Sequence, residues 1–243
     1  QSDSKLMVSL KSGMELACDF AILSIGVRPE VKLAQESGLV IGNCGGIKVN
    51  EYLQTSDPDI YAAGDAVEVK DFVLGNAALI PLAGPANKQG RIVADNLCGR
   101  NVKYKGTQGT AILKIFDLTA AMTGASEKAL RKTGIDYEKL YIHPAHHVGY
   151  YPGARQMHIK LLFTNPEGKI LGVQIIGSKG VDKRIDVFAT AIRAGMTVFD
   201  LQELELAYAP PYGSGKDAVN MAGFVAGNIL DGTFNVKHYD DLD

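Results

Sequence analysis

The stretch Thr55-Ser56-Asp57-Pro58-Asp59-Ile60-Tyr61-Ala62-Ala63-Gly64-Asp65-Ala66 decides the fold of the first half of the chain. Its apolar run, residues 60–63, predicts a buried strand that ends directly at Gly64 and Asp65. Open α/β sheets bind ligands at the carboxyl ends of their strands, and a glycine there lets the backbone approach a ligand closely. Asp65 would then accept hydrogen bonds from the hydroxyl groups of a sugar or polyol. Without further context, a Gly-Asp pair fits equally well a strand followed by the N-cap of a helix.

The segments around this stretch predict further elements of an α/β sheet. The apolar run 20–25 ends at a glycine and predicts a strand that is buried on both faces. Residues 46–49 predict another strand. Pro85 fits the first turn of a helix that stops at Gly99, and the N-terminus of such a helix can bind an anion. The alternative for this helix is a well-capped structural element whose charged side chains are solvated.

The second half has the pattern of a mixed α+β domain. Apolar and polar residues alternate over 157–163, a tight turn follows, and residues 170–176 return as the second strand of a hairpin. Apolar positions at helical spacing predict a helix over 181–192, and residues 217–230 predict the last helix. These elements form no βαβ repeat, which indicates α+β. The boundary between the two halves falls in the polar, glycine-containing stretch 99–109.

Capping signals predict the ends of the helices in this half. Ser126 is a typical N-cap for a short helix that Gly134 ends. Thr197, with Asp200 three residues later, resembles a capping box. Gly195 predicts the end of the preceding helix.

Composition argues against several classes of function. Lys and Arg total 25 and Asp and Glu total 27, so the net charge of -2 argues against nucleic acid as the main partner. The longest uncharged stretch, 72–87, is too short and too interrupted by proline to span a bilayer. The polar start of the chain lacks the apolar region of a signal peptide, so we expect a cytoplasmic protein without membrane contact. Widely spaced cysteines without a C-x-x-C pair predict buried thiols and no redox disulfide within the chain; they are Cys18, Cys44 and Cys98.

Two loops of the second half are dense in reactive side chains. Residues 143–153, His-Pro-Ala-His-His-Val-Gly-Tyr-Tyr-Pro-Gly, contain three histidines and two tyrosines. We expect no metal there, because no tetrahedral set with Cys or a carboxylate is evident. Residues 208–217, Tyr-Ala-Pro-Pro-Tyr-Gly-Ser-Gly-Lys-Asp, place Lys216 at the start of the last helix, on a backbone that two prolines make rigid. From the residues alone, the alternatives are interface aromatics, a rigid connector and a solvated lysine.

The chain resembles the pyridine nucleotide-disulfide oxidoreductases over essentially its whole length. Residues 55–65 are similar to the second flavin-binding motif of that family, T-(S)-x-x-x-I-Y-A-x-G-D. Upstream, Ile25-Gly26-Val27-Arg28-Pro29 resembles the family's return from the NAD(P)H domain. The resemblance implies an α/β, Rossmann-like FAD-binding half-domain followed by an α+β dimerisation domain. It divides the chain into the end of the NAD(P)H-binding domain with its return hinge, the second half of the FAD-binding domain, and the C-terminal dimerisation domain, over residues 1–27, 28–105 and 106–243.

The resemblance also implies which residues would hold FAD. In that family the aspartate of the motif binds the ribityl chain, which assigns this role to Asp65. The helix that contains Pro85 points in the family at the pyrimidine edge of the flavin. The implied FAD-binding residues are Thr55, Ile60, Tyr61, Ala62, Ala63, Gly64, Asp65, Leu82 and Ala83.

Within this family, the second half resembles the coenzyme A-disulfide reductases. Residues 143–153 are similar to H-x-x-x-Y-Y-P-G, and residues 208–223 to Y-A-P-P-Y-S-x-x-K-D-x-V-N-M-A-G, with Gly213 where the family usually has Ser. In those homodimeric enzymes two tyrosines of this domain reach the partner's site. The implied site residues are Tyr150 and Tyr208 as catalytic groups, with Asn87 and Lys216 as contacts of a CoA-type substrate.

Several parts of such an enzyme are absent from the sequence. It contains no G-x-G-x-x-G fingerprint for FAD or NAD(P)H and no redox Cys in an S-F-x-x-C-type stretch. We therefore expect the C-terminal part of an FAD-dependent NAD(P)H oxidoreductase that reduces CoA disulfide, CoA persulfide or polysulfide, and that is inactive as this piece alone. The alternatives are an NADH oxidase or peroxidase of the same family and a catalytically silent dimerisation fragment. The tail 235–243 resembles a linker that leads into a rhodanese domain in some relatives.

Overall fold

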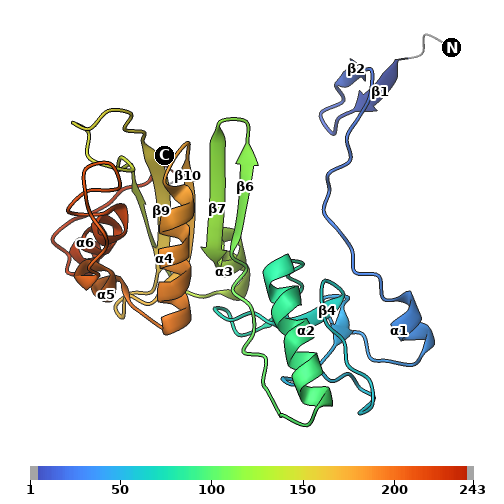
Figure 1. Cartoon of the computed structure of the whole chain (residues 1–243). Coiled ribbons are helices and arrows are strands. Elements are labelled where there is room, and N and C mark those ends of the chain that lie inside the picture. Colours follow the sequence, from blue (N-terminus) through green and yellow to red (C-terminus); the bar gives the residue numbers. More distant parts are fainter. Residues whose placement is uncertain (1–4, 240–243) are drawn as a thin grey trace.

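The N-terminal strands follow the alternating pattern of their sequence. In a computed structural model that describes residues 5–239, β1 (Leu6–Ser9) pairs antiparallel with β2 (Glu15–Cys18). Residues 19–31, without regular secondary structure, then lead to the short helix α1 (Lys32–Glu36), as Figure 1 shows.

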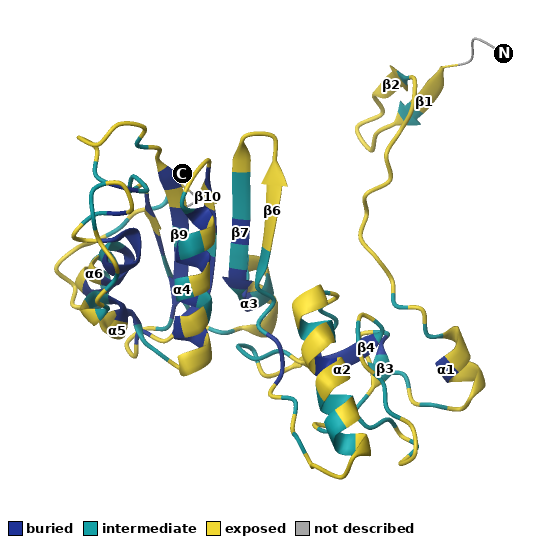
Figure 2. Ribbon diagram, viewed as in Figure 1, coloured by how far each residue is buried: buried dark blue, intermediate teal, exposed yellow. Residues whose placement is uncertain are grey.

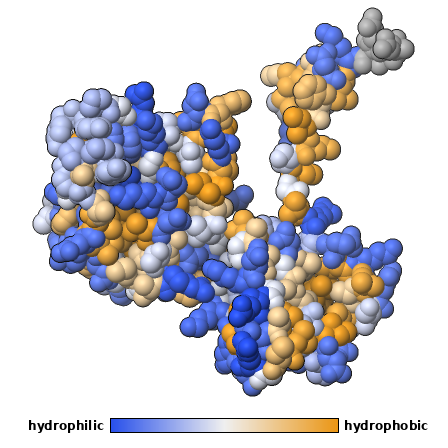
Figure 3. All heavy atoms as spheres, viewed as in Figure 1, coloured by the Kyte–Doolittle hydropathy of each residue, from blue (hydrophilic) through white to orange (hydrophobic). Residues whose placement is uncertain are grey.

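The strand predicted over residues 20–25 does not form. These residues belong to no sheet, and the side chains of Ile22, Leu23 and Ile25 are 80%, 85% and 90% exposed. Figure 2 shows the segment as exposed, and Figure 3 shows that it is largely hydrophobic. The prediction was wrong because a strand of this type needs neighbouring strands and covering helices, and the described residues provide neither.

A small mixed sheet and one long helix dominate the rest of the first half. β3 (Ile47–Lys48) pairs parallel with β4 (Val67–Lys70), and β4 pairs antiparallel with β5 (Ala77–Ala78). α2 (Ala83–Leu97) contains Pro85 in its first turn and ends before Gly99, as the sequence predicts.

The strand predicted over residues 60–63 is also wrong. The N–H of Ala62 donates to the carbonyl of Leu53 at 3.0 Å, and the N–H of Thr55 donates to the carbonyl of Ile60 at 2.9 Å. The chain therefore folds back on itself within a short loop, with one isolated bridge between Gln54 and Tyr61. Because these backbone groups are satisfied locally, they do not form a longer ladder among the described residues.

The second half forms one antiparallel sheet of five strands in the order β6-β7-β10-β9-β8. The strands are β6 (Ala111–Ile115), β7 (Leu118–Gly124), β8 (Glu138–Ile142), β9 (Met157–Phe163) and β10 (Ile170–Gly177). The hairpin predicted from the alternating sequence is β9–β10 and is confirmed. Every pairing in this sheet is antiparallel, which agrees with the α+β prediction.

Helices cover both faces of this sheet. On one face, α4 (Val181–Ala194) packs on β7 and β10, and α6 (Ala218–Leu230) packs on α5 (Val198–Glu203) and on β8, so that these three helices share one apolar cluster. The neighbouring residues Leu161 and Leu162 of β9 point to opposite faces and lie in two separate apolar clusters. The smaller cluster contains Leu130 of α3 (Glu127–Thr133), the helix that Ser126 caps by accepting from the Ala129 N–H.

Glycine allows α6 to approach its neighbour closely. A Cβ atom added to Gly223 would lie 2.8 Å from the carbonyl oxygen of Val198 in α5. The Ala- and Gly-rich sequence of this helix therefore serves a close contact between two helices. The capping box of α5, formed by Thr197 and Asp200, is confirmed.

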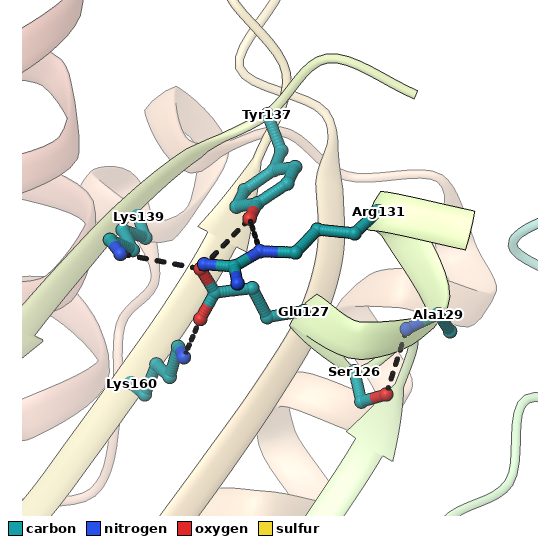
Figure 4. Close-up of polar contacts among 7 residues, drawn as sticks. All are labelled: Ser126, Glu127, Ala129, Arg131, Tyr137, Lys139 and Lys160. Carbon is teal, nitrogen blue, oxygen red and sulfur yellow. Dashed lines mark hydrogen bonds and ion pairs between the residues drawn. The ribbon is translucent and has the colours of Figure 1, made fainter. Parts of the chain in front are cut away.

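An ionic cluster joins α3 to two strands of the sheet (Figure 4). The Glu127 carboxylate accepts hydrogen bonds from Arg131 at 2.7 Å, from the Tyr137 hydroxyl at 2.8 Å, from Lys139 at 3.2 Å and from Lys160. Partial burial alone raises the pKa of Glu127, but the hydrogen bonds from Lys160, Tyr137 and Lys139 outweigh it and lower that pKa to about 2.

The cysteines lie nearer the surface than predicted. All three are free thiols; Cys18 is half-buried, whereas Cys44 and Cys98 are exposed. Cys98 is exposed because it caps the solvent-facing end of α2, and Cys44 lies in a loop where its thiol donates to the carbonyl of Ala77 at 3.3 Å.

Two further predictions concern membranes and the chain ends. Within residues 5–239, no helix combines the length and the apolar character needed to cross a bilayer. The tail expected to precede a rhodanese domain is described only as far as residue 239, and residues 1–4 and 240–243 lie outside the described structure.

Candidate functional site

The Gly64-Asp65 motif is fixed to α2. The backbone φ angle of Gly64 is +94°, a conformation that favours glycine. A Cβ atom added to this residue would have no other atom within 4 Å. Its N–H donates to the side-chain oxygen of Gln89 at 2.7 Å, and Gln89 is almost completely buried in α2. Asp65 is exposed. The motif therefore combines a rigid backbone, open space and an accessible carboxylate.

The other residues predicted to bind FAD fall into two groups. Thr55 shapes its own loop, because its hydroxyl donates to the Asp57 carbonyl and accepts from the Asp57 N–H, both at 3.2 Å. Next to it, Ile60 and Ala63 are exposed, and Tyr61 and Ala62 are half-buried. Leu82 is the N-cap of α2 and Ala83 is its first residue.

The N-terminus of α2 has no side-chain cap among the described residues. Helix N-termini stabilise negative charge through free N–H groups and the helix dipole. With Asp65 held near this helix through Gln89, the site offers an acceptor for polyol hydroxyls and donors for a negative edge. These residues fit a group such as FAD.

Asn87 lies one turn into the same helix. Its side-chain NH₂ donates to the carbonyl of Ala83 at 3.0 Å, and the residue is exposed. Its position is therefore open to a ligand, although one donor is already engaged.

The structure brings together the two tyrosines that were predicted to be catalytic. The hydroxyl oxygens of Tyr150 and Tyr208 are 3.4 Å apart and share a hydrogen bond, although the residues are 58 positions apart in the sequence. This hydrogen bond is the main cause that raises the pKa of the Tyr208 hydroxyl above its ordinary value. Both side chains are exposed, at 77% for Tyr150 and 49% for Tyr208.

Two loops carry these tyrosines and touch each other. We call residues 143–153 the tyrosine loop and residues 208–216 the proline loop. The N–H of Val148 in the tyrosine loop donates to the carbonyl of Gly213 in the proline loop at 3.0 Å.

Lys216 ends the proline loop immediately before Asp217, the N-cap of α6. It is exposed, and its Nζ lies 5.0 Å from the centre of the Phe224 ring. Lys216 is therefore accessible to solvent and lies on the same loop as Tyr208. The helix α2 belongs to the other half of the chain (Figure 1), and Asp65 precedes it in the sequence.

The histidines of the tyrosine loop contact one another and the backbone. The Nδ1 atoms of His143 and His158 are 2.8 Å apart, and burial lowers the pKa of His146. His147 is buried and its ring packs against that of Tyr151. In the part of the chain that the structure describes, no three potential metal-ligating side chains of His, Cys, Asp or Glu lie together.

Sequence reasoning missed two buried polar residues beside these sites, Gln89 and Arg184. A signal existed for Arg184, because it lies three residues after Val181 and four before Phe188, on the apolar face predicted for α4. Gln89 gave no comparable signal, since it is flanked by Lys88 and Gly90.

Comparison with known proteins defines the class of protein. Two family models match, the pyridine nucleotide-disulphide oxidoreductases over residues 1–90 and the dimerisation domain of the same family over residues 110–218. The chain belongs to the pyridine nucleotide-disulphide oxidoreductase family. The fold prediction is confirmed: an α/β half-domain of the family's FAD-binding type is followed by the α+β dimerisation domain.

Particular relatives narrow the resemblance. The chain is 36% identical to the coenzyme A disulfide reductase of Staphylococcus haemolyticus, over 92% of this chain and 50% of that protein. It is 53% identical to reduced CoADR-RHD of Bacillus anthracis, with a TM-score of 0.94, over 97% of this chain and 42% of the other. The NAD-dependent persulfide reductase of A. fulgidus is 39% identical, with a TM-score of 0.94, over 100% of this chain and 45% of the other. The chain thus spans about half the length of the curated relatives it matches.

Proposed function

We propose that the chain is part of an FAD-dependent NAD(P)H oxidoreductase that reduces CoA disulfide, CoA persulfide or polysulfide. The observation that carries this proposal is the hydroxyl pair of Tyr150 and Tyr208, with Lys216 accessible on the proline loop. The names of the relatives, a coenzyme A disulfide reductase and a persulfide reductase, support the same class of substrate.

FAD, when bound, accepts a hydride from NAD(P)H and passes on two electrons. In this proposal Asp65 accepts hydrogen bonds from the ribityl hydroxyls, because its carboxylate is exposed beside the open backbone at Gly64. The N–H groups at Leu82 and Ala83, at the start of α2, would stabilise negative charge on the flavin. The NAD(P)H site and the redox cysteine lie outside this chain.

The net reaction converts a disulfide, NAD(P)H and a proton into two thiols and NAD(P)+. The redox cysteine attacks one sulfur of the substrate, forms a mixed disulfide with it and releases the other sulfur as a thiolate. We assign to Tyr150 and Tyr208 the donation of hydrogen bonds to that thiolate.

The same proposal includes a homodimer. Asp65 and the tyrosine pair lie in different halves of the chain, so a second copy that brings its tyrosines to the flavin site would complete each active site. Asn87 and Lys216 then contact the CoA substrate from the two sides. A cytoplasmic location, the domain bounds at residues 27 and 105, and a following rhodanese domain stay predictions.

The test is a pair of Tyr→Phe substitutions in the full-length enzyme, Tyr150→Phe and Tyr208→Phe together. Phe keeps the ring and removes only the hydroxyl, so we expect disulfide reduction to slow about ten- to a thousand-fold. Stopped-flow traces should show flavin reduction by NAD(P)H within about twofold of the parent, because the tyrosines act after that step. Tyr212→Phe is the matched control, since Tyr212 lies on the same loop at 71% exposure, and it should react at the parent rate.

Two outcomes would contradict the proposal. If the double variant reduces CoA disulfide at the parent rate, the tyrosines have no catalytic role. If the parent enzyme consumes oxygen with NADH and forms no thiol from CoA disulfide, it is an oxidase of the same family.

A further inference from the structure

Arg184 is a buried charge at the base of both functional loops. The residue is 2% exposed and Asp217 is 3% exposed. The guanidinium donates two hydrogen bonds to the Asp217 carboxylate, from Nε at 3.2 Å and from Nη2 at 2.7 Å. Such a planar two-point contact is specific to arginine, because lysine offers a single point charge.

The same guanidinium also binds the tyrosine loop. Its Nη2 donates to the backbone carbonyl of His146 at 2.8 Å, and its Nη1 donates to the carbonyl of Gly180 at 3.4 Å, at the start of α4. His146 lies four residues before Tyr150, and Asp217 follows directly after Lys216. One buried side chain on a rigid helix therefore contacts the tyrosine loop and the end of the proline loop.

Asp217 is also the N-cap of α6, which fixes the end of the proline loop. Its carboxylate caps α6 by accepting from the Val219 N–H at 3.2 Å, and its own N–H donates to the side chain of Asn220 at 3.2 Å. Arg184 thus holds a residue whose backbone and side chain are both fixed by the helix. The loop contact from Val148 to Gly213 lies between the two anchor points.

We propose that Arg184 is a positioning residue, whose buried guanidinium holds the tyrosine loop and the proline loop in the register that brings the hydroxyls of Tyr150 and Tyr208 together. This inference rests on the proposed function of the two tyrosines. Arg184 does not touch the substrate in it and acts only through the loops.

Stability alone does not explain a buried pair of this kind. Taking two charges out of water is costly, and well-packed apolar residues of similar volume often stabilise a protein as well or better. An apolar pair would not, however, bind the carbonyl of His146. The three-way contact explains why an arginine occupies the apolar face of α4.

The test uses the full-length flavoenzyme with the double substitution Arg184→Met and Asp217→Asn. This change removes both buried charges together, and Asn keeps the cap of α6 because it is a good N-cap residue. Arg184→Lys is the second variant, since it keeps the charge and loses the two-point contact. Lys160→Met is the control, because Lys160 contacts Glu127 and Tyr141, which lie outside both loops.

We expect the double variant to fold and to reduce its flavin with NADH within about twofold of the parent, while CoA disulfide reduction slows about ten- to a hundred-fold. In a Tyr150→Phe/Tyr208→Phe background the same change should slow that step less than about threefold further, because groups that act as a unit are not additive. Arg184→Lys should be slowed to an intermediate extent, and Lys160→Met should match the parent. A folded double variant at the parent rate, or a full additional loss without the tyrosine hydroxyls, would overturn the inference.

Amide hydrogen exchange separates this inference from the proposed function. The Val148 N–H, which donates to Gly213, should lose protection in the folded double variant and keep it in the Tyr→Phe variant. Unchanged protection there overturns the positioning role, whatever the kinetics. A parent rate for the Tyr→Phe variant overturns the proposed function, whereas lost protection at Val148 would still support Arg184 as the residue that holds the loops.

Discussion

Glu127→Gln should destabilise the C-terminal domain through a single ionic cluster. The side chains of Glu127, Lys139 and Lys160 are only 15%, 12% and 15% exposed. Glutamine keeps the shape of the side chain and removes its charge. The half-buried ammonium groups of Lys139 and Lys160 then lose their ion pairs with the carboxylate, and weakening the neutralisation of desolvated charges is costly.

The magnitude follows from the pKa of Glu127. Lowering it from an ordinary value of 4.5 to about 2 corresponds to about 3 kcal/mol, at about 1.4 kcal/mol per pKa unit. The Arg131 side chain is 62% exposed, so water and salt screen part of the electrostatic interaction within the cluster. We therefore expect the substitution to lower the free energy of unfolding by about 1–2 kcal/mol at pH 7.

The loss should depend on pH with a definite sign. The pKa of Glu127 is lowered on folding, so the stabilisation is fully present above about pH 4.5 and disappears as the pH falls through about 2. By pH 3 the difference between the parent and Glu127→Gln should shrink to about two-fifths of its value at pH 7.

The assay is urea unfolding followed by far-ultraviolet circular dichroism, at one fixed protein concentration and at pH 7, 4 and 3. We expect the pH 7 midpoint to fall by about 0.5–1 M urea. Glu167→Gln is the matched control, because Glu167 is exposed in the β9–β10 turn, and its midpoint should change little. A loss below about 0.3 kcal/mol, or an equal loss at pH 7 and pH 3, would show that charge in the cluster does not supply the stability.

Three further predictions concern the proposed site and assembly. In the full-length enzyme, Asp65→Ala should lower FAD content at equal purity much more than it alters dimerisation; unchanged flavin absorbance would refute the assignment of the motif. Lys216→Ala should raise the KM for CoA disulfide about tenfold with little change in kcat, since it removes a binding charge and no reacting group, and a pure kcat effect in steady-state kinetics would contradict this. The 243-residue chain should sediment as a dimer at micromolar concentration, and a monomer would count against tyrosines that act across subunits.

Local chemistry explains the parts of the fold that could be predicted from the sequence. Ser126 and Thr197 cap the N-termini of two helices, and Gly195 caps the C-terminus of a third, all where the sequence predicts them. Each cap depends only on neighbouring backbone groups. The β9–β10 hairpin follows from alternation and one turn. These features involve few residues at short range.

The errors arose where structure depends on distant partners. An apolar run such as 20–25 or 60–63 becomes a strand only when other strands pair with it, and no pattern within the run reveals whether they are present. Likewise, the contact between Tyr150 and Tyr208 could be inferred only through the family resemblance, because 58 residues separate them. The buried Gln89 escapes pattern reading because its partner, the Gly64 N–H, lies on another segment of the chain.

We expect the exposed segment 20–25 to favour self-association of this 243-residue chain at high concentration. Six consecutive residues, Phe-Ala-Ile-Leu-Ser-Ile, carry no charge and no proline, and the large side chains among them are 74% to 90% exposed. Segments of this composition stack between molecules into cross-β fibrils when nothing covers them. The substitution Ile22→Lys should reduce such self-association, at a position remote in sequence from Asp65, the tyrosine loop and the proline loop.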